Sequence, residues 1–135
     1  MALIAPETLT FVDCNEASAL AIRAPSRLSI IGRRPTDMTA EHQPDGRSSA
    51  DLINELVHKV MNNGSHRFEW QMRRLDGTMT WSEIVATAIT LEGRTLIFTT
   101  SRNIEERKKM ENELRVSERR WRRVFEQIPF SMQIF

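Results

Sequence analysis

Residues 66–101 decide the fold, and they read HRFEWQMRRLDGTMTWSEIVATAITLEGRTLIFTTS. The segment consists of β-rich runs separated by short connections, and its first run alternates apolar with polar side chains. The pair Asp76-Gly77 is a strong signal for a two-residue hairpin turn, and Glu92-Gly93 signals a second tight turn. Because such connections leave little choice of topology, the segment predicts three antiparallel strands, at 66–74, 79–91 and 94–101.

Local signals predict the elements on either side. Residues 49–62 form the clearest amphipathic helix, because Leu52, Leu56 and Val60 share one face, and Gly64 suits its C-terminal end. Residues 104–127 read as a long helix without Gly or Pro. Upstream, the sequence predicts strands at 2–5 and 9–15, a helix capped by Asn15 and ended by Ala24-Pro25, helical turns near 26–31 and 35–41, and an exposed loop at 41–47.

This order of elements predicts an α+β domain: a five-stranded antiparallel sheet with helices on one face, followed by a long C-terminal helix. The 135 residues are enough for one ordinary domain. No apolar run approaches the roughly 20 residues that span a bilayer, so we expect a soluble segment. We expect it to be cytoplasmic, while the parent protein could be attached to a membrane. The single cysteine, Cys14, excludes an internal disulfide and a multi-cysteine metal site, and a net charge of +1 gives no overall attraction to nucleic acid.

Three stretches resemble the PAS domains of bacterial signalling proteins: FVDCNEASAL at 11–20, IGRRPTDMTAEHQPDGRSSADLINELV at 31–57, and GSHRFEWQMRRLDGTMTWSEIVATAITLEGRTLIFTTSRNIEERKKMENEL at 64–114. The resemblance implies a PAS sensory domain at 1–103 and a helical signalling linker at 104–128. It is most similar to a subgroup in multi-domain sensors that carry a diguanylate cyclase, phosphodiesterase or histidine kinase module.

Both ends of the domain carry further hints from the family. The segment 129–135 is similar to the start of another PAS domain, with residues 1–5 as its counterpart here; a frayed apolar tail is the alternative. Many PAS domains end in Asp-x-Thr, whereas this chain has Asn103, Ile104 and Glu105 at the matching signal junction. The uncharged Asn103 loses an ion pair, which implies weaker coupling between sheet and helix.

Comparison with ligand-binding PAS relatives implies a small-molecule pocket on the helix-facing side of the sheet. Its expected lining is apolar with a few hydroxyls, which suits a small neutral ligand and equally an ordinary filled core. The implied residues are Leu56, Val60, Trp70, Met72, Ser82, Ile84, Ala86, Thr99 and Ser101.

Two further surfaces suggest self-association. The opposite sheet face is unusually apolar, so we expect a second subunit or an N-terminal helix to cover Trp81, Val85, Leu96 and Phe98. The long helix has a heptad seam of Arg107, Met110, Leu114, Ser117, Trp121, Val124 and Ile128. We interpret it as a coiled-coil linker; a solvated mixed-charge helix and a DNA-binding basic arm are the alternatives. The two surfaces together predict a homodimer, with the helix folding back over its own sheet as the alternative.

Two residues invite a cofactor interpretation. Cys14 lacks the Asn-Cys-Arg motif of flavin-binding relatives, so we interpret it as a structural cysteine. His58 lies on the polar side of the helix at 49–62, away from where a haem ligand must point. Haem and flavin are therefore not expected, and neither is a metal site or a catalytic group.

Together these observations predict a non-enzymatic sensory module. It would sense a small molecule or a partner and relay the signal through a dimeric helical linker to an effector domain in the same chain. A ligand-free module that dimerises or spaces domains is the alternative, and a haem or flavin sensor is a third possibility.

Overall fold

The computed structural model describes residues 1–127, with side chains described as far as Val124. It divides into two compact units, of which the first is Met1–Asn103 and the second begins at Ile104. Ile128 of the predicted seam and the segment 129–135, the possible start of another domain, lie outside the described residues.

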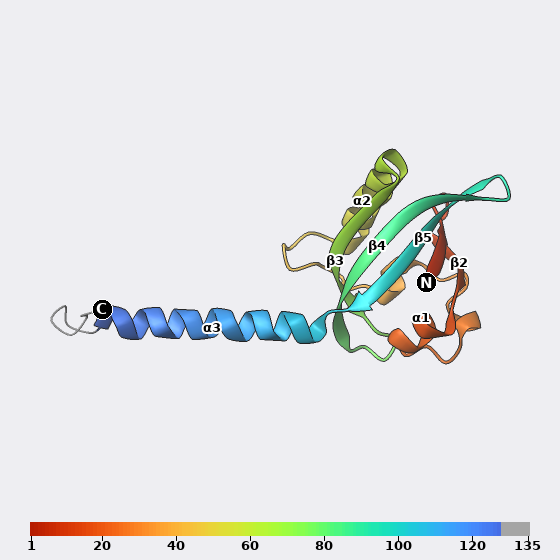
Figure 1. Ribbon diagram of the computed structural model, residues 1–135. Coiled ribbons are helices and arrows are strands. Elements are labelled where there is room, and N and C mark those ends of the chain that lie inside the picture. The colour runs from red at the N-terminus through yellow and green to blue at the C-terminus, as the bar shows by residue number, and fades with distance from the viewer. Residues whose placement is uncertain (128–135) are drawn as a thin grey trace. The chain divides into compact units, whose positions relative to one another are not determined.

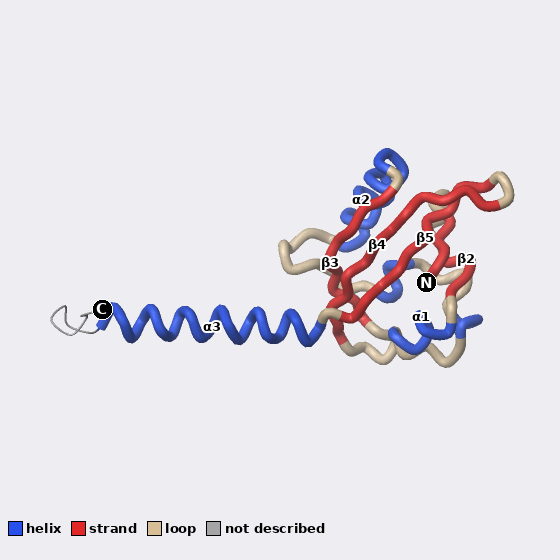
Figure 2. The backbone as a smooth tube through the Cα atoms, in the orientation of Figure 1, coloured by secondary structure: helices blue, strands red, loops and turns tan. Residues whose placement is uncertain are grey.

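The first unit is built on one antiparallel sheet of five strands in the spatial order β2-β1-β5-β4-β3 (Figures 1 and 2). The strands are β1 (Ala2–Ala5), β2 (Thr10–Cys14), β3 (Ser65–Arg73), β4 (Met79–Leu91) and β5 (Arg94–Asn103). Between β2 and β3 the chain forms α1 (Glu16–Ala21), the 3₁₀ turns η1 (Arg27–Ser29) and η2 (Pro35–Met38), and α2 (Ser49–Asn63). The predicted α+β class and the order of elements are confirmed.

The register of β3, β4 and β5 confirms the predicted alternation of faces. Trp70 of β3 lies opposite Ser82 of β4, and Ser82 lies opposite Asn103 of β5. The neighbouring row pairs Gln71 with Trp81 and therefore belongs to the other face, because successive side chains of a strand point to opposite sides.

The connection between β3 and β4 differs from the predicted two-residue turn. The Arg74 amide donates to the Thr78 carbonyl over 2.7 Å, and the Gly77 amide donates to the Arg74 carbonyl over 2.9 Å. Three residues, Leu75, Asp76 and Gly77, therefore form the loop. Gly77 has φ +91°, the left-handed conformation with which three-residue hairpin loops commonly end. The turn at Glu92 and Gly93 does have two residues, since Leu91 pairs directly with Arg94.

Helix α1 ends at Ala21, before the Ala24-Pro25 stop that the sequence suggests. Asn15 caps its start as predicted, its Oδ1 accepting from the Ser18 amide over 3.0 Å. At the other end Arg23 has φ +56°, and the Ala24 amide donates back to the Ala19 carbonyl over 2.9 Å. This hydrogen-bonding pattern closes a helix without a proline.

Helix α2 matches its prediction within one residue and supplies the apolar surface that faces the sheet. Val60, near its C-terminal end, is buried in a cluster with Ala86 of β4 and Ile97 of β5. Gly64 ends the helix in a left-handed conformation at φ +86°, and its amide donates to the Val60 carbonyl. The second unit contains α3 (Glu105–Gln127), which matches the helix predicted at 104–127 within one residue. That this helix is a signalling linker stays a prediction.

Candidate functional site

The first unit contains a partly open cavity of about 160 Å³, lined by residues of the sheet, α1, η2 and α2. An apolar cavity of about 150 Å³ is large enough to hold benzene, whereas pockets for drug-sized ligands begin at about 300 Å³. The cavity therefore has room for one small molecule with a ring or a short chain.

All nine residues of the predicted pocket lie in the wall of this cavity. They come from α2, β3, β4 and β5: Leu56, Val60, Trp70, Met72, Ser82, Ile84, Ala86, Thr99 and Ser101. Ser101 is exposed and Val60 is buried, so the wall extends from the interior to the surface. That these residues bind a ligand stays a prediction.

The wall contains further residues that the sequence analysis did not select. Phe68 and Ile97 follow the same alternation as Trp70 and Thr99, so the strand pattern contained the signal for both. The first hairpin and the segment before α2 contribute others for which no sequence pattern gave a signal: Ala2, Ile4, Phe11, Cys14, Ile30, Met38 and Thr39. Ala2 and Ile4 are placed by the pairing of β1 with β5, and Thr39 by a bridge to Met72 of β3; both are long-range contacts.

Trp70 is held in the wall by a hydrogen bond and by aromatic packing. Its side chain is 6% exposed, and its indole Nε1 donates to Thr39 Oγ1 over 3.3 Å. The Thr39 hydroxyl in turn donates to the Pro35 carbonyl over 2.7 Å. The indole also meets the Phe68 ring edge to face, with centroids 5.7 Å apart. The ring is thus fixed by a hydrogen bond as well as by packing.

The hydroxyl groups that line the cavity differ in whether they have a hydrogen-bond partner. Thr99 Oγ1 donates to the Ala2 carbonyl over 3.3 Å, and Ser18 Oγ donates to the Met1 carbonyl over 2.8 Å. Ser82, 9% exposed near the start of β4, has no hydrogen-bond partner for its Oγ within residues 1–127. A nearly buried hydroxyl in an apolar wall can give or accept one hydrogen bond, which would orient a bound molecule.

Gln43 fixes the segment that leads into α2. It lies in the loop predicted to be exposed, yet only 7% of the residue is accessible. Its Nε2 donates to Ser49 Oγ over 3.0 Å and to the Gln71 carbonyl over 3.1 Å, and its Oε1 accepts from the Gln71 amide over 2.9 Å. The prediction of a fully exposed loop is wrong here, because this amide joins the start of α2 to β3.

No protein-family model and no curated protein match the chain. Solved structures do. A PAS domain from Colwellia psychrerythraea superposes with a TM-score of 0.62 at 21% identity, covering 78% of this chain and 86% of that one. A sensory box histidine kinase/response regulator from Burkholderia thailandensis gives 0.61 at 19% identity, covering 90% of each chain. A PAS domain of a LuxR-family transcriptional regulator from Burkholderia thailandensis, in complex with ethanol, gives 0.55 at 18%, covering 76% and 88%.

The chain has the PAS fold. With the strand order and the cavity already described, these likenesses confirm the fold that the sequence resemblance implied. Within residues 1–127 no helix is long and apolar enough to cross a membrane.

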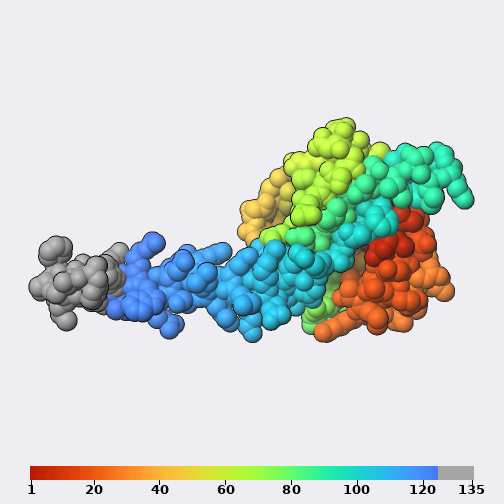
Figure 3. Space-filling model, viewed as in Figure 1, coloured from red at the N-terminus to blue at the C-terminus, as the bar shows by residue number. Residues whose placement is uncertain are grey.

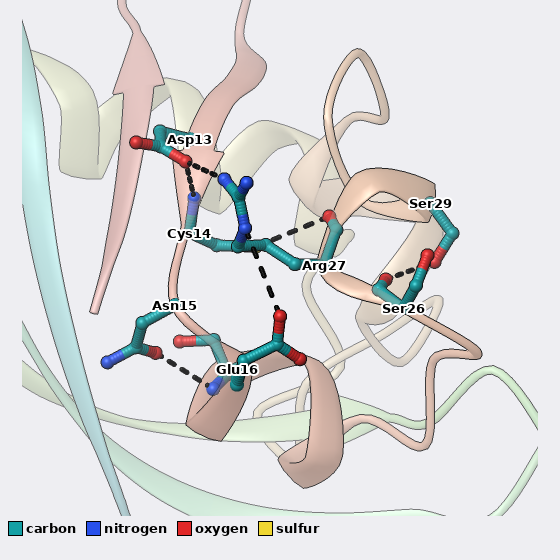
Figure 4. A network of polar contacts seen from close by, with 8 residues as sticks. Asp13, Cys14, Asn15, Glu16, Ser26, Arg27 and Ser29 are labelled. Carbon is teal, nitrogen blue, oxygen red and sulfur yellow. Dashed lines mark hydrogen bonds and ion pairs between the residues drawn. The ribbon is translucent and has the colours of Figure 1, made fainter.

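Cys14 lines the cavity as a buried side chain, and Figure 4 shows it among its polar neighbours Asp13 and Arg27. Its Sγ lies 3.6 Å from the Arg27 carbonyl, while Asp13 accepts from both the Cys14 amide and Arg27 Nη1 over 2.8 Å. Burial raises the pKa of the Cys14 thiol. The thiol therefore stays protonated at neutral pH, where only a thiolate would be an effective nucleophile.

His58 is exposed on α2, as the helical pattern predicted. It does not belong to the cavity wall. In the part of the chain that the structure describes, no cluster of three His, Cys, Asp or Glu side chains could hold a metal ion.

The outer face of the PAS sheet bears a smaller apolar patch than predicted. Trp81, Val85 and Phe98 are half-buried, but Leu96 is only 5% exposed and adds almost no accessible area. Leu96 lies in β5, the central strand of the sheet, directly opposite Ile89 of β4. Leu3 of β1 lies opposite Phe98 and is also half-buried. We call Leu3, Trp81, Val85 and Phe98 the outer-face patch; Figure 3 shows β4 and β5 (green to cyan) at the surface on this side.

The described part of the predicted seam on α3 is solvent-exposed. Four apolar side chains of the seam are exposed to solvent, and we call them the α3 stripe: Met110, Leu114, Trp121 and Val124. At the junction, Asn103 is the last residue of β5, Ile104 is buried, and Glu105 begins α3. That the three residues form a signal junction stays a prediction.

Proposed function

We propose that this PAS domain is a sensory module that binds one small, uncharged, mostly apolar molecule in its cavity. The observation that carries the proposal is the partly open, apolar cavity of about 160 Å³ with the partnerless Ser82 hydroxyl in its wall. A charged ligand would lose its hydration without gaining an ion pair there, because the wall contains no Asp, Glu, Lys or Arg. The related PAS domain in complex with ethanol supports a small alcohol as one possible class of ligand.

The route of the signal follows from the strand register. Ser82 is paired across the sheet with Asn103, the last residue of β5, and α3 begins two residues later at Glu105. A ligand that bonds to Ser82 would shift the end of β5 and thereby the start of α3. We propose that α3 passes this change to an effector domain in the same cytoplasmic protein, of the histidine kinase or cyclic-di-GMP class.

We further propose that the module works as a homodimer. The outer-face patch would form the contact, because an antiparallel sheet normally exposes a polar face and this one carries Trp81 and Phe98. The same patch favours the second candidate function, a ligand-free module that only pairs or spaces domains. The two differ in one respect: only the sensor needs an occupied cavity.

Ligand binding to the purified chain tests the proposal. Native mass spectrometry would detect a retained molecule, and thermal-shift titrations with toluene, benzyl alcohol and 1-butanol would measure binding to the empty cavity. We expect Ala86→Leu, which fills the space beside Val60 and Ile97, to abolish binding. The matched control is Thr87→Leu, one residue further on β4 and on the outer face, which should leave binding unchanged.

Ser82→Ala separates the role of the hydroxyl from that of the cavity. It should lower the binding affinity for benzyl alcohol by roughly tenfold, the contribution of one hydrogen bond, and leave the affinity for toluene unchanged. If neither a retained molecule nor any binding is detected, or if Ala86→Leu binds as well as Thr87→Leu, the sensor proposal is wrong and the spacer function remains.

A further inference from the structure

The charges of α3 are arranged around its apolar stripe in an ordered way. Each residue advances the helix by about 100°, so glutamates at four positions flank the stripe: Glu106 and Glu113 on one side, Glu111 and Glu118 on the other. Most basic residues lie on the opposite face: Lys108, Lys109, Arg115, Arg119, Arg122 and Arg123. The exceptions are Arg107, which is part of the seam, and Arg120, which lies beside the stripe. The stripe itself is exposed along its described length.

This arrangement opposes the parallel pairing of two copies of α3. In a parallel coiled coil the positions flanking the seam face each other across the interface. Glu106 of one chain would then face Glu111 of the other, and Glu113 would face Glu118. Because a parallel pair has two-fold symmetry, each contact occurs twice, which gives four like-charge contacts. The flanking positions between Glu106 and Glu118 hold no basic residue that could form a compensating ion pair across the interface. Arg107 and Ser117 weaken the seam further, because neither supplies an apolar side chain.

The glutamates also lack full neutralisation from their own helix. Ion pairs along this part of α3 join Glu111 to Arg107 at 3.6 Å and to Lys108 at 3.8 Å, and both basic groups are partly exposed. Such exposed pairs are weak and leave the negative field beside the stripe largely in place.

We propose that the α3 stripe is a docking surface for an amphipathic helix whose own apolar stripe is flanked by Lys or Arg. Apolar side chains of that partner would cover Leu114 and Trp121, and its basic residues would face the flanking glutamates. A second copy of α3 in parallel register is the wrong partner, so the homodimer is held by the outer-face patch. This inference goes beyond the proposed function and does not depend on an occupied cavity.

A pair of designed peptides tests the charge rule directly. Both have four heptads with Leu and Ile at the seam; one has Lys at every flanking position and the other has Glu. Binding to the intact chain is followed by the fluorescence of Trp121, with Trp121→Phe as the reference for the signals of Trp70 and Trp81. An exposed ion pair contributes about a factor of two in affinity, so four should make the Lys peptide bind at least roughly tenfold more tightly. The difference should shrink in about 1 M salt, where charges are screened.

Charge reversal of one flank supplies the second arm. The double variant Glu111→Lys, Glu118→Lys converts the four like-charge contacts of a parallel pair into four attractive ones, so its self-association constant should exceed that of the unmodified chain by about tenfold or more. The control Glu111→Gln, Glu118→Gln removes repulsion without adding attraction and should lie between the two. Equal affinity for the two peptides, or a self-association that the lysine variant fails to strengthen, would overturn the proposal.

Discussion

Gln43 is hydrogen-bonded through its side-chain amide to both main-chain polar groups of Gln71, 28 residues further along the chain. Gln71 lies in β3, an edge strand of the sheet. An edge strand presents unpaired N–H and C=O groups, which need a partner when they are shielded from water. The Gln43 amide is a partner for both groups, and the Gln71 carbonyl also accepts from the Ala40 amide over 3.3 Å. Gln43 also holds Ser49, the first residue of α2, so one side chain joins the edge of the sheet to the helix that covers it.

We expect Gln43→Leu to lower the free energy of unfolding by about 1–3 kcal/mol, the cost of leaving buried polar groups without partners. Urea denaturation measures this loss. Gln71→Ala is the matched control, because it removes a side chain but keeps the main-chain groups that Gln43 binds. A loss for Gln71→Ala as large as that for Gln43→Leu would contradict the role of the amide.

We expect Trp70→Ala to lower the free energy of unfolding by about 3–5 kcal/mol, the range for truncating a buried large aromatic side chain. Trp70 packs against Phe68 and bonds Thr39, so both contacts disappear together. Trp81→Ala, in the neighbouring row on the outer face, should cost clearly less in the same chemical denaturation. A loss below about 1 kcal/mol for Trp70→Ala would place its side chain at the surface.

The Asp76 carboxylate should make stability depend on acid pH. Hydrogen bonds from the Thr78 hydroxyl, then from Arg23 and the Thr78 amide, hold the pKa of Asp76 well below its usual range. Because the folded-state pKa is depressed, the stabilisation is fully present above the unfolded pKa of about 4 and is lost as the pH falls below it towards the folded value.

Urea denaturation between pH 2 and 7 checks this dependence. The difference between the unmodified chain and Asp76→Asn should be constant above about pH 5 and should shrink below about pH 4. Arg23→Ala keeps both bonds from Thr78, so most of the pH dependence should remain in that variant. A difference that is independent of pH would show that Asp76 is not held in its ionised form.

Phe98→Asp should convert the proposed homodimer into a monomer, because it places a charge in the middle of the outer-face patch beside Leu3. Sedimentation equilibrium at micromolar concentration measures the change. The control is Thr90→Asp, an exposed position near the end of β4 outside the patch. If the unmodified chain sediments as a monomer, the homodimer proposal is wrong. If Phe98→Asp still sediments as a dimer, the interface does not include the outer-face patch.

Much of the sheet and its inner face could be predicted from the sequence. The alternation through Phe68, Trp70 and Met72 has a period of two, and the turns at Asp76-Gly77 and Glu92-Gly93 connect neighbouring strands. Both signals act over a few residues, so they determine which side chains share a face before any long-range contact is known. This is why the residues predicted for the pocket, from Trp70 to Ser101, all lie around the same cavity.

Other features depended on contacts that no local pattern encodes. Gln43 stands in a stretch rich in Pro, Asp and Gly, which is typical of an exposed loop, and its burial follows from reaching Gln71 in β3. Leu96 alternates like a residue of the outer face, yet it is only 5% exposed, and the alternation along β5 does not encode that burial. The residues of the first hairpin reach the cavity only because β1 pairs with β5, about a hundred residues away in the chain.

By itself, then, the sequence determined the order of the elements, the antiparallel meander and the face to which each strand residue belongs, because hydrogen-bonded turns and side-chain periodicity are local properties. Whether the inner face is filled or hollow was decided only by the tertiary structure. The same set of apolar residues, including Val60 and Ala86, is compatible with a filled core or with a space of about 160 Å³. The volume of the cavity is the small difference between the space inside the domain and the volume of the side chains that fill it. Segments far apart in the chain contribute those side chains, so no periodicity along the sequence predicts the difference.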